Sequence, residues 1–118
     1  MKRTQPMMNY KQGDVVLLEV VFTEGIGKKK RPALILSNDY YHKGRQEVII
    51  AAITSNVHRV LPGDTVITEW ESAGLKFPSL VAGILQTMKR EMIIRKFGAL
   101  TKKDFKKVKR NIKKLLFA

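Results

Sequence analysis

The sequence contains no cysteine. The chain therefore cannot form a disulfide, use a thiol as a nucleophile, or bind zinc or an iron–sulfur cluster through cysteine. Acidic residues are also few, 10 against 23 lysines and arginines, and they are scattered along the chain. The two histidines, His42 and His58, lie in polar surroundings, and we expect both to be solvated surface residues. We therefore expect no metal site and no cofactor.

Several nucleotide-binding and hydrolase motifs are missing as well. Gly25-Ile26-Gly27-Lys28 has a glycine-rich start but lacks the Walker spacing and the Ser or Thr that follows it, and no dinucleotide-binding fingerprint occurs. Ser37, Asp39 and His42 do not form a nucleophile-elbow motif, so we interpret Ser37-Asn38-Asp39 as a turn.

Long apolar runs are absent too. The basic N-terminus, residues 1–10, lacks the apolar stretch of a signal peptide, and no later segment is long enough for a membrane-spanning helix. We therefore expect a cytoplasmic protein with no membrane association. Residues 1–10 are expected to form a flexible arm.

Positive charge is abundant, with a formal net charge of +13 on 118 residues. A dense basic surface binds phosphates and releases their counterions, so nucleic acid is the favoured partner. An acidic protein, or a surface that is merely solvated, remains an alternative. With 44% hydrophobic residues the chain can build one core, and we expect a single domain over residues 1–118.

Short apolar segments separated by turns dominate the pattern. They predict strands over residues 15–22, 32–36, 47–54, 65–70, 79–87 and 92–97. The segments 15–22 and 47–54 are apolar on both faces, so they are typical of strands that are buried on both sides, with 47–54 at the centre of the fold. Residues 88–91 could equally form a helical turn, and Gly98 predicts a strand end.

The last segment, residues 101–117, has a helical period. Apolar residues recur at spacings of three and four, and Thr101 with Asp104 has the spacing of a capping box. With the strands, this amphipathic helix predicts a mainly β fold, an SH3-like barrel with a C-terminal helix. Its polar face could bind RNA, lie on an anionic membrane, or simply face water, which we favour, and its charge can still steer RNA.

Four consecutive cations run into a proline at Lys28-Lys29-Lys30-Arg31-Pro32. Pro32 fixes its own φ and pushes Arg31 toward an extended conformation, so Arg31 is presented from the entrance of a strand. A guanidinium held in this way suits an anion site. Residues 23–27 contain two glycines and predict a flexible loop that can close over a ligand.

Read together with Ala51-Ala52-Ile53-Thr54-Ser55-Asn56, this basic stretch resembles the MazF/PemK family of toxin endoribonucleases. Further matching elements, in the same order along the chain, are Gly13-Asp14, Pro62-Gly63-Asp64 and Pro78-Ser79. The resemblance implies an SH3-like barrel with an accessory helix and a homodimer. It also implies metal-independent cleavage of single-stranded RNA and inhibition by an acidic antitoxin protein.

By motif position, the resemblance implies that Arg31 and Thr54 form the catalytic pair. The residues expected to contact RNA are Lys28, Lys29, Lys30, Ser55, Lys76 and Gln86. Where the family commonly has a Gln or an acid followed by Ile/Leu-Arg-Thr, this chain has Gly83-Ile84-Leu85-Gln86-Thr87, so Gln86 replaces the arginine.

The chemistry of RNA cleavage without a metal fits these residue types. The ribose 2′-OH must attack the neighbouring phosphorus, and the extra negative charge must be stabilised. Arg31 suits the second task because its forked donors grip two phosphate oxygens. Thr54 suits positioning of the 2′-OH or a phosphate oxygen better than base catalysis, and without the resemblance it would be an ordinary strand-end threonine. A non-catalytic SH3-like binding module and a gyrase-directed toxin are the alternative functions.

Overall fold

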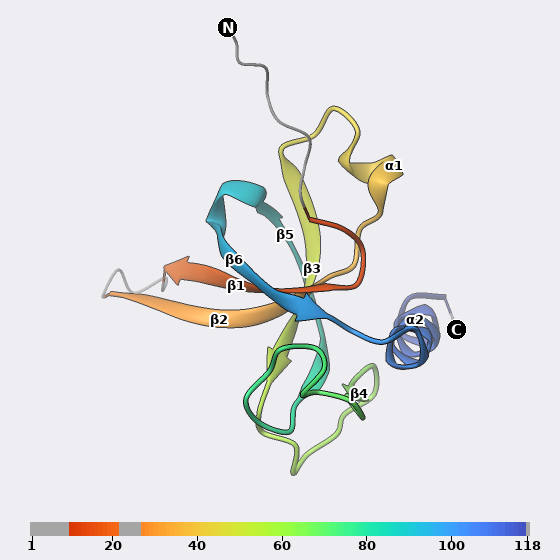
Figure 1. The fold of residues 1–118 in the computed structure, drawn as a ribbon. Coiled ribbons are helices and arrows are strands. Elements are labelled where there is room, and N and C mark those ends of the chain that lie inside the picture. The colour runs from red at the N-terminus through yellow and green to blue at the C-terminus, as the bar shows by residue number, and fades with distance from the viewer. Residues whose placement is uncertain (1–9, 22–26, 118) are drawn as a thin grey trace, which may run out of the picture.

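A six-stranded antiparallel sheet and a C-terminal helix make up the fold (Figure 1). The computed structural model describes residues 10–21 and 27–117. The strands are β1 (Asp14–Val21), β2 (Lys28–Ile35), β3 (Glu47–Thr54), β4 (Thr65–Val66), β5 (Leu80–Lys89) and β6 (Ile93–Ala99). The helices are α1 (Asp39–His42), the 3₁₀ turn η1 (Arg90–Met92) and α2 (Lys102–Phe117).

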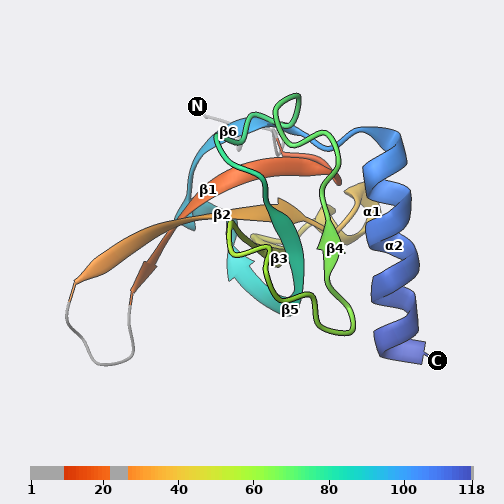
Figure 2. The ribbon, with the colours of Figure 1, turned by 90° about the horizontal axis from the view of Figure 1, so that it is seen from below.

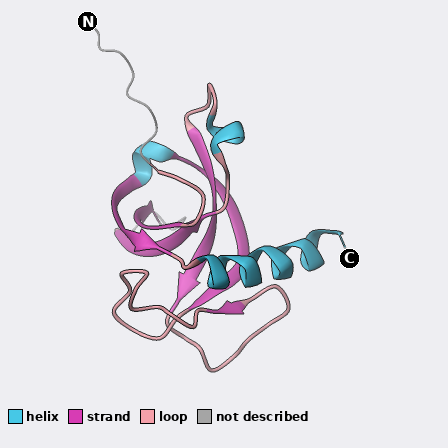
Figure 3. Ribbon diagram, turned by 45° about the vertical axis from the view of Figure 1, so that its right-hand side comes forward, coloured by secondary structure: helices cyan, strands magenta, loops and turns pink. Residues whose placement is uncertain are grey.

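The strand order is β4-β5-β3-β2-β1-β6, and β4 and β6 form the two edges. Figure 2 shows the sheet curving strongly beside α2, yet no pairing joins the two edges in the described part of the chain. The predicted mainly β fold with a C-terminal helix is therefore confirmed, as a curved sheet that stays open. In Figure 3 the strands form one continuous layer and α2 lies along one side of it.

Strand β3 lies at the centre of the sheet with β5 on one side and β2 on the other. Its bounds are the predicted ones, because an apolar run on both faces requires cover on both sides. Alternate residues supply two buried clusters: Ala51 and Ile53 belong to one, and Val48 and Ile50 to the other. The first cluster lies under α2, whose Phe105, Val108 and Ile112 pack against it.

Helix α2 begins with the predicted cap but uses its first acid differently. Thr101 Oγ1 accepts a hydrogen bond from the backbone N–H of Asp104 at 3.1 Å. The Asp104 carboxylate, only 1% exposed, turns away from the helix start and accepts from the N–H groups of Thr68 and Glu69 at 3.1 and 2.9 Å. Lys107 lies 3.2 Å from the same carboxylate. Asp104 therefore ties the helix to the loop after β4.

This contact explains an error in the sequence prediction. Residues 65–70 were expected to form one strand, but β4 ends at Val66. The N–H groups that would continue the strand are taken by Asp104, and a turn follows in which Leu75 N–H donates to the Trp70 carbonyl at 3.1 Å. Pairing to β5 therefore stops after two residues.

Replacing Asp104 by alanine is expected to lower the free energy of unfolding by about 2–4 kcal/mol, because two half-buried N–H groups lose their acceptor. Burial raises the pKa of Asp104, but the N–H groups of Glu69 and Thr68 and the charge of Lys107 outweigh it, so the pKa is lowered. The stabilisation is thus full above the ordinary pKa of 3.8 and is lost as pH falls through the lowered value.

Urea unfolding of the wild type and Asp104→Ala at pH 7 and at pH 3 measures this effect. The difference between the two proteins should be large at pH 7 and smaller at pH 3. Glu71→Ala, which removes an exposed acid of the same loop, is the matched control and should cost less than about 0.5 kcal/mol. An equal loss in both variants would exclude the proposed anchoring role of Asp104.

Other boundaries differ from the prediction in informative ways. The lysine run was expected in a loop, but β2 begins at Lys28, so these cations lie on a strand paired with β1. Gly98 was expected to end a strand, yet β6 continues to Ala99. A side chain at Gly98 would lie 2.7 Å from the Ala73 carbonyl oxygen, so glycine is needed there for close packing rather than as a stop. Of residues 88–91, the first two belong to β5 and the last two to η1, so the expected helical turn is confirmed for residues 90–91.

The expected arm at residues 1–10 lies outside the described residues except for Tyr10, as does the expected loop at residues 23–27 except for Gly27. The strands of the described residues form one sheet, and a single domain over residues 1–118 stays a prediction. No helix in the described part of the chain has the length and apolar character needed to span a bilayer.

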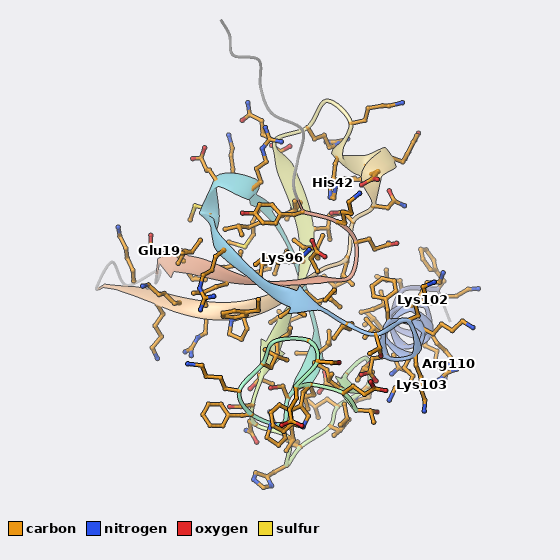
Figure 4. The ribbon with its side chains drawn as sticks, viewed as in Figure 1. Glu19, His42, Lys96, Lys102, Lys103 and Arg110 are labelled. Carbon is orange, nitrogen blue, oxygen red and sulfur yellow. The ribbon has the colours of Figure 1, made fainter. Side chains whose placement is uncertain are left out.

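The prediction for His42 was wrong, whereas His58 is exposed as expected. Residues Asp39–His42 form α1, capped by Asn38, rather than a plain turn (Figure 4). His42 is buried, and its Nε2 lies 2.7 Å from Ser37 Oγ, which also accepts from the N–H of Ile49 at 2.9 Å. Burial lowers the pKa of His42, with the charge of Asp39 opposing the shift and that of Arg90 adding to it. This pair joins α1 to the central strand.

Candidate nucleic-acid cleavage site

The site lies where β2 and β3 separate. Their pairing runs from Ile35 opposite Ile50 to Ala33 opposite Ala52 and then ends. Among the described residues, the part of β2 before Ala33 pairs with β1 alone, and the part of β3 after Ala52 pairs with β5 alone. Continuing the register by two residues would place Arg31 opposite Thr54. Side chains of opposed residues lie on the same face of a sheet, so both point to the same side of the opening.

A groove with a volume of about 910 Å³ occupies this opening. Its lining includes five of the predicted site residues, which are Arg31, Thr54, Ser55, Lys76 and Gln86. They come from β2, the end of β3 and the residue that follows it, the loop before β5, and β5 itself. Small apolar side chains, among them Ala33 and Ala52, also line the groove, and their small size keeps it deep. The strand order thus brings Arg31 together with residues that lie 23 to 55 positions after it in the sequence.

The three predicted lysines lie elsewhere. Lys28, Lys29 and Lys30 are exposed on the first half of β2 and are not among the groove-lining residues that the structure describes. Their partners across the pair are Val21, Val20 and Glu19 of β1. Figure 2 shows this β1–β2 pair extending away from the body of the sheet. The lysines therefore form a basic extension beside the groove.

Thr54 is held at the end of β3, opposite Leu80 of β5. Its Oγ1 accepts a hydrogen bond from the Asn56 N–H at 3.1 Å, which fixes the hydroxyl oxygen. This bond uses a lone pair, so the O–H is left to donate. The geometry favours a positioning role for Thr54 over a role as a base.

Arg95 was missed by the sequence analysis. It lies on β6 and lines the groove, and its Cζ is 4.7 Å from the centre of the Phe97 ring. The period-two spacing of Arg95 and Phe97 predicts that they share a face, but nothing local predicts what lies beside β6. The neighbour is the loop before β5, which approaches because Gly74 and Gly98 leave no side chains between them. Lys76 and Phe77 of this loop complete the same wall.

The charge around the groove has one sign. Arg31, Lys76 and Arg95 line it, and no aspartate or glutamate does among the described residues. The basic face of α2 lies away from it: Figure 4 shows Lys102, Lys103 and Arg110 on the helix at one end of the molecule and Glu19 on β1 at the other. In the described ranges no three His, Asp or Glu side chains gather as a metal site would require. The groove therefore suits a polyanion held by guanidinium and ammonium groups.

Comparison with known proteins points to one family. Residues 11–116 match the family model for the PemK-like, MazF-like toxin of type II toxin–antitoxin systems. No curated protein matches the chain at a significant level.

Solved structures share the fold at low sequence identity. An endoribonuclease from a mycobacterial species is 16% identical with a TM-score of 0.74, over 95% of this chain and 95% of that chain. The MazE–MazF complex of Deinococcus radiodurans is 19% identical with a TM-score of 0.73, over 91% of this chain and 95% of that one. The Mycobacterium tuberculosis toxin MazF-mt6 is 24% identical with a TM-score of 0.64, over 84% and 93%.

Proposed function

Because the chain belongs to the family of PemK-like, MazF-like toxins of type II toxin–antitoxin systems, we propose that it cleaves single-stranded RNA at the Arg31–Thr54 groove. The observation that carries the proposal is the separation of β2 from β3, which opens a positively charged groove between these two side chains. Solved structures with this fold include proteins named as endoribonucleases.

In the proposed reaction the ribose 2′-OH attacks the adjacent phosphorus, and the bond to the 5′-oxygen of the next nucleotide breaks. The products are a 2′,3′-cyclic phosphate and a 5′-OH: the 2′-OH loses its proton to solvent water, and the leaving 5′-oxygen takes a proton from solvent water. Arg31 donates two hydrogen bonds to the non-bridging oxygens, whose charge grows in the transition state. Arg31 serves in this scheme as an electrostatic stabiliser rather than as the proton donor.

Thr54 orients the attacking ribose in this scheme. Its oxygen is fixed by the Asn56 N–H and its O–H points a donor toward the 2′-oxygen or a phosphate oxygen. Ser55, Lys76 and Gln86 contact the nucleotides on either side, since they line the same groove. Lys28, Lys29 and Lys30 contact phosphates farther along the strand, which adds affinity without sequence preference. No metal or cofactor takes part in this mechanism.

The proposed regulator is an acidic protein encoded beside this gene. A protein with a net charge of +13 binds RNA through many phosphates, and an intracellular ribonuclease of this kind needs a competitor. A partly disordered acidic segment with a few apolar anchors would occupy the basic groove and exclude RNA. Two solved structures with this fold are MazE–MazF complexes, and another is a complex of an endoribonuclease with its cognate antitoxin. We place the protein in the cytoplasm as a homodimer.

The test is cleavage of a single-stranded RNA by the purified protein in the presence of a chelator, with and without the neighbouring acidic protein, at two salt concentrations. Cleavage should persist with the chelator, and the acidic protein should abolish it at both salts because apolar contacts survive screening. Arg31→Ala, purified in parallel, controls for contaminating ribonuclease. RNA binding without cleavage would refute the enzyme and favour a non-catalytic binding module.

A further inference from the structure

The wall formed by Phe77 and Arg95 in the groove lining carries two features that the proposed cleavage does not use. Phe77 is 63% exposed although it lines the groove, and Arg95 lines it without an ion pair or hydrogen bond to any described residue. A large aromatic side chain left in water next to cations calls for a ligand with both an apolar face and a negative charge.

Phe77 is held in place although its ring is exposed. Leu75, two residues earlier, packs on the core cluster beneath α2, which anchors the start of the segment. Ser79 is buried, and its Oγ donates to the Phe77 carbonyl oxygen at 2.8 Å. The backbone on both sides of Phe77 is thereby fixed. Little conformational entropy remains to be lost when a ligand contacts the ring.

Arg95 is held by Phe97, whose ring packs on the same core cluster. The Arg95 Cζ lies over this ring, 4.7 Å from its centre. No hydrogen bond to a described residue uses the N–H donors of the guanidinium, so they are left for a ligand. Close approach of Gly98 to the Ala73 carbonyl brings the loop that carries Phe77 against β6, which carries Arg95.

We propose that this wall is a binding subsite for one nucleotide that flanks the scissile bond, in which Phe77 stacks on the base and Arg95 binds its phosphate. The inference rests on the proposed function for the identity of the ligand as single-stranded RNA. Single-stranded RNA is recognised by stacking of unpaired bases on aromatic rings together with cationic contacts to its backbone. A subsite of this kind contributes affinity and register, and Phe77 touches no reacting atom.

The experiment maps the cleavage position in a short RNA and then replaces each flanking base, one at a time, by an abasic nucleotide. Phe77→Ala should raise KM for the intact RNA by about tenfold, as for other stacking aromatics, with kcat changed less. Phe77→Trp should restore KM. At one flanking position the abasic RNA should lower wild-type affinity by the same factor, and Phe77→Ala should then cause no further loss. This non-additivity identifies the base that the ring contacts.

Arg95→Ala should weaken RNA binding, and the slope of log K against log salt concentration should fall by about the contribution of one phosphate contact. Arg95→Lys should keep most of the affinity and most of that slope. The chain offers matched controls. Arg45 lies over the Tyr41 ring at 4.6 Å outside the groove, and Phe117 is 78% exposed at the end of α2. Arg45→Ala and Phe117→Ala should leave KM within about twofold.

Two outcomes would overturn the subsite: Phe77→Ala with wild-type KM, or a Phe77→Ala loss that persists in full on every abasic RNA. Either result leaves wild-type cleavage intact, so the proposed function survives it. If the wild type cleaves no RNA, the proposed function fails instead. The same substitutions are then measured by binding of the same oligonucleotides, where loss of affinity in Phe77→Ala that disappears at one abasic position still supports the subsite, and unchanged affinity excludes it.

Discussion

Arg31→Lys is expected to lower the rate of RNA cleavage by at least about 10²-fold while RNA affinity falls by less than about tenfold. Lysine keeps the positive charge, so the contact with the polyanion survives. It offers one rotating ammonium in place of a planar fork, and it cannot give two parallel hydrogen bonds to the oxygens of a pentavalent phosphorus. The loss therefore falls on the transition state rather than on binding.

Single-turnover rates measure this effect with enzyme in excess, and affinity is measured with an RNA that cannot be cleaved. Lys30→Ala is the matched control, because Lys30 precedes Arg31 on β2 but does not line the groove. It should weaken binding and leave the single-turnover rate at saturation within about twofold. A lysine variant at position 31 with the wild-type rate would remove Arg31 from the mechanism.

A substrate with deoxyribose at the scissile nucleotide is expected to resist cleavage completely. The 2′-OH is the nucleophile in the proposed reaction, so its removal leaves no attacking atom, however well the groove binds the strand. Affinity should change by less than about tenfold, because phosphates and bases supply most of the contacts. The measured loss of rate should therefore be as large as the sensitivity of the product assay allows.

The scissile-deoxy substrate lacks one oxygen atom of the all-ribose RNA, and the control carries the same single deoxyribose at another position. Deoxyribose placed two nucleotides away from the mapped cleavage position should leave the rate within a fewfold of that for RNA. Cleavage of the scissile-deoxy substrate at a comparable rate would mean that water or an enzyme group attacks the phosphorus, and the roles assigned to Arg31 and Thr54 would have to be replaced.

Most of the sheet could be predicted from local pattern. Strand β3 was predicted to the residue, because a run that is apolar on both faces fits only the centre of a sheet. The segment 65–70 has an equally good strand pattern and nonetheless forms two strand residues. The competing acceptor is Asp104, which lies more than thirty residues away, so no local signal could have shown that it takes the N–H groups of Thr68 and Glu69.

His42 shows a similar limit. Its sequence neighbours are polar, which favours exposure, but the fold places Ser37 between it and Ile49 and buries the ring. Local polarity did not predict this, because the burial depends on how α1 packs on β3. His58, in an equally polar context without such a partner, is exposed.

The candidate site was half predictable. Arg31 and Thr54 were chosen from a family resemblance, and the register of β2 against β3 gives a physical reason for their proximity. Arg95 and Phe77 carry no motif, and they reach the groove because the loop before β5 packs on β6 through two glycines. A sequence pattern cannot predict that such side chains lie close together, because their proximity depends on how the loop packs on the strand. Their roles remain predictions.

Analysis of the product ends tests the central claim most directly. The wild-type protein is incubated with single-stranded RNA and a chelator, and the termini of the fragments are identified by mass spectrometry. Attack by the 2′-OH predicts a 2′,3′-cyclic phosphate on one fragment and a free 5′-OH on the other, formed at the same rate with and without the chelator. Fragments with 5′-phosphates, formed only when a divalent metal ion is present, would contradict the account and indicate attack by metal-activated water.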